Sequence, residues 1–346
     1  MRLSEALFRL SFTGYGLACA FGAVMGLALS LPGTLRMKRD WAGWVRFAVC
    51  VLFFGWLGAR VMFAAPDLLM GFLNEQGLIQ EHNSVYLNQI GSAVPALYFW
   101  EGGYSLVGAM LGAILGAKLA EKWTGEESGF WRDRLALVLP AFVLVERLAE
   151  QGSSLGTGVE VSAQWLIRTG LCPEEDGVFF HPLYLYEALL AAVVLAVMAW
   201  LEIRRAGKAA GGDRLRFCLT IFCLPMIVIE SLRPLTGHMI LHFVNVTQVV
   251  LMILALSVVI RWSVRLGRNR RDVRHPALAL AVCWVVVIAA IGAAVYCIFG
   301  MEKDWVSRGL AYGVIALAMA AMAAVAAVLY RLSGPKGGLP DGARED

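Results

Sequence analysis

The sequence has few charged residues. Aspartate, glutamate, lysine and arginine together make up only 16% of the 346 residues, whereas hydrophobic residues make up 59%. Charged residues account for about 25% of an ordinary soluble domain, so this composition excludes that class. The mean hydropathy of +0.67 supports the same conclusion. The chain is therefore predicted to be an integral membrane protein.

The sequence also lacks paired cysteines, and the arrangement of its cysteines argues against a metal centre or a disulfide framework. The 7 cysteines form no Cys-x-x-Cys pair, and most of them fall inside apolar stretches. We expect them to act as small apolar side chains. No cofactor and no metal ion are expected. The first apolar run is long and lacks a clear cleavage site, so it predicts a span rather than a cleaved signal peptide.

Apolar runs recur along the whole chain. A helix of about 18 residues or more crosses the hydrocarbon core of a bilayer, and these runs lack the alternation of barrel strands. The sequence therefore predicts an all-α fold, a polytopic transmembrane helical bundle. The predicted spans cover residues 11–31, 43–65, 104–121, 134–150, 182–202, 215–233, 239–262, 277–299 and 306–331.

Basic residues concentrate in alternate connections between these spans. The longest basic run, RWSVRLGRNRRDVRH, follows the seventh span, and others follow the first, third and fifth. The positive-inside rule places these connections in the cytoplasm, which leaves the N-terminus and the connections 66–103 and 151–181 outside. A basic run beside a span is typical of a topology anchor, so no nucleic-acid partner is expected.

Glycines repeat at a spacing of four residues in the third span. Gly108, Gly112 and Gly116 lie on one face of the predicted helix. This pattern favours close packing against a neighbouring helix.

Ionisable residues interrupt the apolar run VLVERLAEQGSSLGTG. Glu146 and Glu150 share a helix face, whereas Arg147 points about 100° away from them. Arg147 is therefore expected to be free to serve something other than its two neighbouring glutamates. Charges at this depth usually face a cavity or pair with one another, and an ion pair at the end of the span is the alternative.

Two further polar clusters lie at the outer ends of spans. HPLYLYEALL places His181, Tyr186 and Glu187 at a helix start, and IVIESLRPLTGH places Glu230 and Arg233 three residues apart. Glu230 and Arg233 either form an internal pair or bind a ligand. If Arg147, Arg233 and the arginine at position 60 converge on one outer cavity, their guanidinium groups suit a phosphate or a carboxylate.

The order of these motifs resembles the prolipoprotein diacylglyceryl transferase family, from about residue 10 to about residue 264. VERLAEQGSSLGTG takes the place of the family signature Gly-Arg-(Ile/Leu)-Gly-Asn…Gly, with Arg147 on the arginine. HPLYLYEALL is similar to His-Pro-Ser/Thr-Gln-Leu-Tyr-Glu, and ESLR is similar to Glu-Phe-Phe-Arg. The other matching positions are Tyr15, Arg60, Glu101, Gly102, Gly103, Gly158 and Gln248.

The resemblance implies an activity and a location. Family members transfer the diacylglyceryl group of phosphatidylglycerol to the lipobox cysteine of a prolipoprotein, at the outer face of the inner membrane. This implies a transferase whose partners are a phospholipid and prolipoprotein signal peptides. Arg147 and Arg233 would hold the phosphate, and Glu150 or His181 would take the thiol proton. The expected pocket is lined by Tyr15, Arg60, Glu101, Gly102, Gly103, Gly158, Tyr186, Glu187, Glu230 and Gln248.

Three positions depart from the family pattern. Val107 stands where the family has a histidine, Met226 where it has an arginine, and Glu150 where it has an asparagine. Glu150 and Glu101 favour an alternative, a phospholipid-dependent transferase with a different acceptor. Val107 and Met226 favour another, a membrane protein that binds lipid or lipoprotein without catalysis.

The predicted organisation has three parts. Residues 1–265 form a seven-span transferase-like core with the outer connections 66–103 and 151–181. Residues 266–333 add two further C-terminal spans beyond that core. Residues 334–346, GPKGGLPDGARED, form a Gly/Pro-rich cytoplasmic tail.

Overall fold

The protein is represented by a computed structural model. It describes residues 13–75, 104–151, 156–161, 163–204, 211–233, 239–240, 244–268, 275–303 and 305–333.

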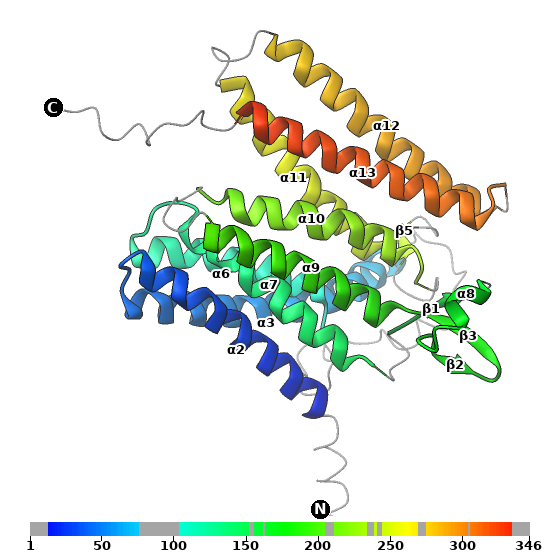
Figure 1. Ribbon diagram of the computed structural model, residues 1–346, viewed down its shortest axis with the longest axis horizontal. Coiled ribbons are helices and arrows are strands. Elements are labelled where there is room, and N and C mark those ends of the chain that lie inside the picture. Colours follow the sequence, from blue (N-terminus) through cyan, green and yellow to red (C-terminus); the bar gives the residue numbers. More distant parts are fainter. Residues whose placement is uncertain are drawn as a thin grey trace, which may run out of the picture. The chain divides into compact units, whose positions relative to one another are not determined.

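Nine helices of 18 or more residues dominate the described part of the chain, one at each predicted span, and they confirm the all-α membrane bundle (Figure 1). Six of them are long and apolar enough to cross a membrane, whereas spanning by α6, α7 and α10 stays a prediction. The nine are α2 (Thr13–Arg36), α3 (Trp41–Glu75), α6 (Leu106–Thr124), α7 (Phe130–Ala149), α9 (Leu183–Arg204), α10 (Asp213–Glu230), α11 (Val246–Arg268), α12 (Pro276–Glu302) and α13 (Arg308–Ser333).

The chain divides into two compact units. The first comprises residues 1–218 and 232–238, and the second comprises residues 219–231 and 239–346. Helix α10 begins in the first unit and continues in the second. The domain boundary that the sequence predicts near residue 265 stays a prediction.

In the first unit, α3 packs against α6, α2 against α7, and α7 against α9. The α3–α6 contact uses the glycine repeat of the third predicted span. A Cβ atom added at Gly116 would lie 2.5 Å from the carbonyl oxygen of Cys50, and one added at Gly112 would overlap the carbonyl oxygen of Phe54. The two backbones therefore touch, as the glycine spacing predicts.

A small sheet connects α7 to α9. It contains β1 (Thr157–Glu160), β2 (Glu174–Glu175) and β3 (Val178–Pro182) in the antiparallel order β1-β3-β2, with the one-turn helix α8 (Gln164–Ile167) between β1 and β2. The amide of Val159 in β1 donates a hydrogen bond of 2.8 Å to the carbonyl oxygen of Leu232, which follows α10. The sheet thus ties the segment after α10 to the start of α9.

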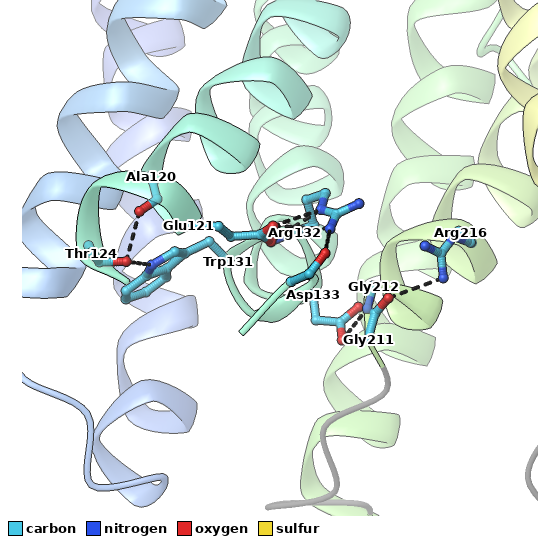
Figure 2. Close-up of polar contacts among 10 residues, drawn as sticks. Ala120, Glu121, Thr124, Trp131, Arg132, Asp133, Gly211, Gly212 and Arg216 are labelled. Atoms are coloured by element: carbon cyan, nitrogen blue, oxygen red, sulfur yellow. Dashed lines mark hydrogen bonds and ion pairs between the residues drawn. The ribbon is translucent and has the colours of Figure 1, made fainter. Parts of the chain in front are cut away.

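Polar contacts fix the C-terminal end of α6 and the N-terminal ends of α7 and α10 (Figure 2). The side chain of Arg132 donates hydrogen bonds to both oxygens of the Glu121 carboxylate, from Nε to Oε1 at 3.1 Å and from Nη2 to Oε2 at 3.0 Å. The carboxylate of Asp133 accepts backbone N–H bonds from Gly212, Arg214 and Leu215. The first amides of a helix have no partner within it, so Asp133 caps α10 from a different helix.

In the second unit, α12 and α13 form a hairpin that packs on α11 (Figure 1). The rings of Trp262 in α11 and Tyr330 in α13 lie 5.3 Å apart, centroid to centroid. A two-stranded antiparallel ribbon, β4 (Met239–Ile240) and β5 (Val244–Asn245), leads into α11.

The α3–α6 contact predicts that Gly112→Ala destabilises the protein. The new methyl group would force the two helices apart, and such overpacking costs about 1–3 kcal/mol. The matched control is Gly313→Ala in α13, where an added Cβ meets nothing within 4 Å. We expect a melting temperature in detergent several degrees lower for Gly112→Ala only. Equal melting temperatures for both variants would contradict the close contact.

Candidate active site

Three glutamates converge on the guanidinium group of Arg147. Its Nε lies 2.6 Å from Oε2 of Glu187 and 3.1 Å from Oε2 of Glu146. Its Nη1 donates a 2.6 Å hydrogen bond to Oε2 of Glu150. Glu146 and Arg147 lie in the last turn of α7, Glu150 is its C-cap, and Glu187 lies in the second turn of α9. All four residues are buried.

One prediction about Arg147 is wrong. The sequence indicated that it points away from Glu146 and Glu150 and is free to serve something else, yet it forms ion pairs with both. Helical spacing fixes the direction of the Cα–Cβ bond only. The long arginine side chain bends back along α7, and burial favours that bend because a buried guanidinium requires carboxylate partners.

Glu187 adds a second guanidinium group to this cluster. Its Oε1 accepts a 2.7 Å hydrogen bond from Nη2 of Arg233, while its Oε2 lies beside Nε of Arg147. The side chain of Glu187 is 0% exposed, so the two arginines share one fully buried carboxylate. The structure therefore brings together the two arginines that the sequence assigned to phosphate binding.

The backbone around Gly158 explains how Arg233 reaches this place. Leu232, the residue before Arg233, accepts a backbone hydrogen bond from Val159 of β1. A Cβ atom added at Gly158 would lie 2.9 Å from the carbonyl oxygen of Leu232 and 2.9 Å from Cβ of His181. Real Cβ atoms do not approach backbone so closely, so a glycine is needed for this strand to pass between them.

Tyr15 of α2 completes the cluster. Its hydroxyl group donates a 2.5 Å hydrogen bond to Oε1 of Glu146. The other oxygen of Glu146, Oε2, is buried and accepts no hydrogen bond from the described residues, although Nε of Arg147 lies 3.1 Å from it as an ion-pair partner. Glu146 was noted in the sequence as a charged residue but was not among the expected site residues. Its position one helical turn before Glu150 is the signal that could have added it.

His181 and Tyr186 form a separate pair beside Gly158. Nδ1 of His181 lies 3.2 Å from the hydroxyl oxygen of Tyr186, and either atom can donate, depending on the tautomer. Partial burial lowers the pKa of His181 below its usual value of 6.5, because burial disfavours the charged imidazolium. A neutral imidazole at neutral pH is able to accept a proton.

The remaining expected residues are placed as follows. The guanidinium group of Arg60 lies 5.6 Å from the ring centroid of Phe63 and 5.7 Å from that of Tyr104. Convergence of Arg60 with Arg147 and Arg233 stays a prediction. Glu101, Gly102 and Gly103 lie outside the described residues.

The second unit brings Glu230 and Gln248 together through Asn245. The side-chain amide of Asn245 donates a 2.8 Å hydrogen bond to Glu230, and its backbone N–H donates a 3.3 Å bond to Oε1 of Gln248. Asn245 was missed in the sequence, although an asparagine just before an apolar run is typical of a helix start. In the described part of the chain, no group of three or more histidine, cysteine or acidic residues could hold a metal ion.

The fold and this buried arginine–glutamate cluster define an integral membrane protein with a polar site at the ends of its helices. The family model for prolipoprotein diacylglyceryl transferase matches residues 5–264, and the chain belongs to this family of transferases.

Curated relatives of the chain carry the name phosphatidylglycerol–prolipoprotein diacylglyceryl transferase. The protein from Leifsonia xyli is 32% identical over 39% of this chain and 41% of its own length. Those from Synechococcus sp. and Parasynechococcus marenigrum are 24% and 26% identical, over 63% and 65% of this chain and 74% and 77% of their own lengths. The alignment thus covers less than half of the first relative and about three quarters of the other two.

The shared carboxylate predicts that Glu187→Gln strongly destabilises the protein. The substitution leaves two guanidinium groups short of a buried negative charge, and breaking such a buried pair costs about 3–5 kcal/mol. The control is Glu175→Gln, because Glu175 lies exposed in β2. Thermal unfolding in detergent measures both effects, and an unchanged melting temperature for Glu187→Gln would show that the pair is not formed.

Proposed function

We propose that this protein transfers a diacylglyceryl group from phosphatidylglycerol to the lipobox cysteine of a prolipoprotein, forming a thioether. The observation that carries the proposal is the sharing of Glu187 by Arg147 and Arg233, which holds two guanidinium groups in one buried site. A guanidinium group offers a planar fork of N–H donors that matches the oxygens of a phosphate. Membership of the transferase family supports the same activity.

The proposed reaction exchanges one bond for another at the glycerol carbon. The cysteine thiolate attacks the carbon that carries the phosphate, a C–S bond forms, and the C–O bond to glycerol phosphate breaks. The leaving group gains negative charge, and the two arginines stabilise that charge in a site of low dielectric constant. The thiol must first lose its proton, because the thiolate is the nucleophile.

Two residues are candidates for the base that takes this proton. Burial lowers the pKa of His181 and so favours its neutral form, and its Nδ1 lies 3.2 Å from the hydroxyl oxygen of Tyr186. Glu150 already accepts a hydrogen bond from Arg147 and lies at the end of α7. Val107, which stands where the family has a histidine, is a buried apolar residue of α6 and supplies no base.

The proposed setting is the inner membrane, with the N-terminus outside, the C-terminus in the cytoplasm and the site facing outward. This orientation follows from the positive-inside rule, which places the basic connections in the cytoplasm and the connection 151–181 outside. The residues of the Arg147 site flank the connection 151–181, so the site faces outward. The proposed partners are phosphatidylglycerol and prolipoprotein signal peptides.

A second candidate function is binding of lipid or lipoprotein without transfer. It is favoured by the burial of Val107 and Met226, which fill with apolar atoms two positions where the family has basic side chains. Loss of a basic group weakens stabilisation of the leaving phosphate but leaves an apolar lipid site intact.

Rescue of cells depleted of their own transferase tests the proposed activity. We expect the wild-type chain to restore lipidation of prolipoprotein, and Arg147→Ala and Arg233→Ala to lower it by roughly 100-fold or more, as loss of a group that stabilises the transition-state charge does. Arg168→Ala is the control, because Arg168 is exposed beside α8. Absence of rescue by wild-type protein that is correctly inserted would favour the non-catalytic function.

The pH profile of lipidation distinguishes the two candidate bases. Burial disfavours charged His181, so its neutral form persists to a lower pH than that of a free histidine. With His181 as the base, the rate is high above this lowered pKa and falls as the pH drops through it, at a midpoint below 6.5. We expect His181→Asn to abolish that midpoint. A midpoint that persists in His181→Asn and disappears in Glu150→Gln would assign the base to Glu150.

A further inference from the structure

Helices α3 and α6 carry exposed basic residues near one common end, away from the Arg147 site. Arg46 lies in the second turn of α3, and Lys118 and Lys122 lie in the last two turns of α6. All three side chains are exposed. We call these three residues the basic face, because the glycine contact described above holds the two helices side by side.

A contact between Arg46 and Trp123 joins the two helices at this end. The guanidinium carbon of Arg46 lies 5.9 Å from the centroid of the Trp123 ring, and Trp123 follows Lys122 in α6. This cation–π contact holds the arginine of α3 beside the end of α6 that carries the lysines. The basic residues of the two helices therefore belong to one surface.

The acidic residues near this end of the helices do not neutralise the basic face. Glu121 and Glu126 already form ion pairs with arginines that lie outside it. Asp40 precedes α3 and Glu127 follows α6, so both lie beyond the helix ends. In the described part of the chain, no carboxylate forms an ion pair with a residue of the basic face. Its three positive charges therefore remain available to an anion.

Tryptophans indicate the depth of the basic face in the membrane. Trp41 begins α3 and Trp123 lies in the last turn of α6, and they are 53% and 58% exposed. Exposed tryptophans gather at the level of the lipid headgroups. The basic residues lie within about two helical turns of these tryptophans. Their long side chains can therefore extend to the headgroup level.

Apolar residues continue the same surface towards the middle of the membrane. Val49 and Phe53 lie three and seven residues after Arg46, so they share its face of α3. Leu115 lies three residues before Lys118 on α6. All three apolar side chains are exposed. Since α3 is one of the six helices apolar enough to cross a membrane, these side chains face acyl chains. Positive charge followed by apolar surface is the order that complements an anionic phospholipid.

We propose that this surface of α3 and α6 binds an anionic phospholipid, with its phosphate at the basic face and its acyl chains along the exposed apolar residues. A zwitterionic lipid binds less tightly, because its own cation lies close to the same three positive charges. In the orientation proposed above, the bound lipid belongs to the cytoplasmic leaflet. This lipid stabilises the contact between α3 and α6 and is not a substrate of the outward-facing Arg147 site.

Competition between two lipids with the same acyl chains tests the proposal. The full-length protein in detergent is mixed with equal amounts of phosphatidic acid and phosphatidylcholine, and bound lipid is measured by native mass spectrometry. One basic residue near the membrane surface strengthens binding of an anionic lipid roughly fivefold. From three such residues we expect phosphatidic acid to be enriched about tenfold or more. Equal binding of the two lipids would overturn the proposal.

Lysine variants test whether the enriched lipid lies at the basic face. We expect the double variant Lys118→Gln and Lys122→Gln to lose most of the enrichment, whereas Lys118→Arg with Lys122→Arg keeps both charges and the enrichment. Arg308→Gln is the control, because Arg308 is exposed at the start of α13, outside the basic face. Enrichment that survives the glutamine double variant belongs to another site and contradicts the proposal.

Thermal unfolding in detergent gives a second readout. A ligand that binds only the folded state raises the melting temperature. Phosphatidic acid should therefore raise the melting temperature of the wild-type protein more than phosphatidylcholine does, and this difference should disappear in the glutamine double variant. Equal effects of the two lipids on the wild-type protein would contradict the proposal.

The lipidation assay separates this inference from the proposed function. A protein that lipidates nothing but binds phosphatidic acid through the basic face rejects the function and retains the inference. Lipidation by a protein that shows no enrichment of phosphatidic acid rejects the inference and retains the function.

Discussion

The ion pair between Arg147 and Glu187 determines the arrangement of the site. An arginine inside an apolar helical bundle is stable only beside carboxylates, because the bilayer offers it no water. Glu187 comes from α9 and Arg147 from α7, so their contact fixes these two helices against each other. The same carboxylate binds Arg233, which follows α10. One buried side chain thereby positions three separate segments of the chain.

Glycines bring the other segments close enough for these contacts. A Cβ atom added at Gly26 of α2 would lie 2.7 Å from the carbonyl oxygen of Val138, so the backbones of α2 and α7 nearly touch. This contact sets α2 beside α7, so that Tyr15 of α2 reaches Glu146 of α7. Gly158 has the corresponding role between Leu232 and His181. The polar cluster thus depends on a backbone that contains glycine where helices and strands cross.

Hydropathy predicted the helices because the apolar runs are about as long as a bilayer requires, and six of the nine helices meet that requirement in length and composition. Arg147, Arg233 and Glu187 were candidates for the site on a different ground, because a charged side chain inside an apolar run is costly. The partners of each charge were not predictable. Sequence spacing orients Cβ atoms but leaves a long side chain several rotatable bonds, and Arg147 used them to reach Glu146 and Glu150. Nor does spacing within one helix reveal which residue of α9 will lie opposite α7.

Glu150 links the charge balance of the site to its chemistry. It binds Nη1 of Arg147, so it occupies a donor that a phosphate oxygen would otherwise use. With Glu150 as the base, the thiol proton would neutralise its carboxylate, weaken this charge-assisted bond and release the guanidinium group towards the leaving phosphate. With His181 as the base, Glu150 stays bound to Arg147 throughout, and Arg147 must divide its donors between Glu150 and the phosphate.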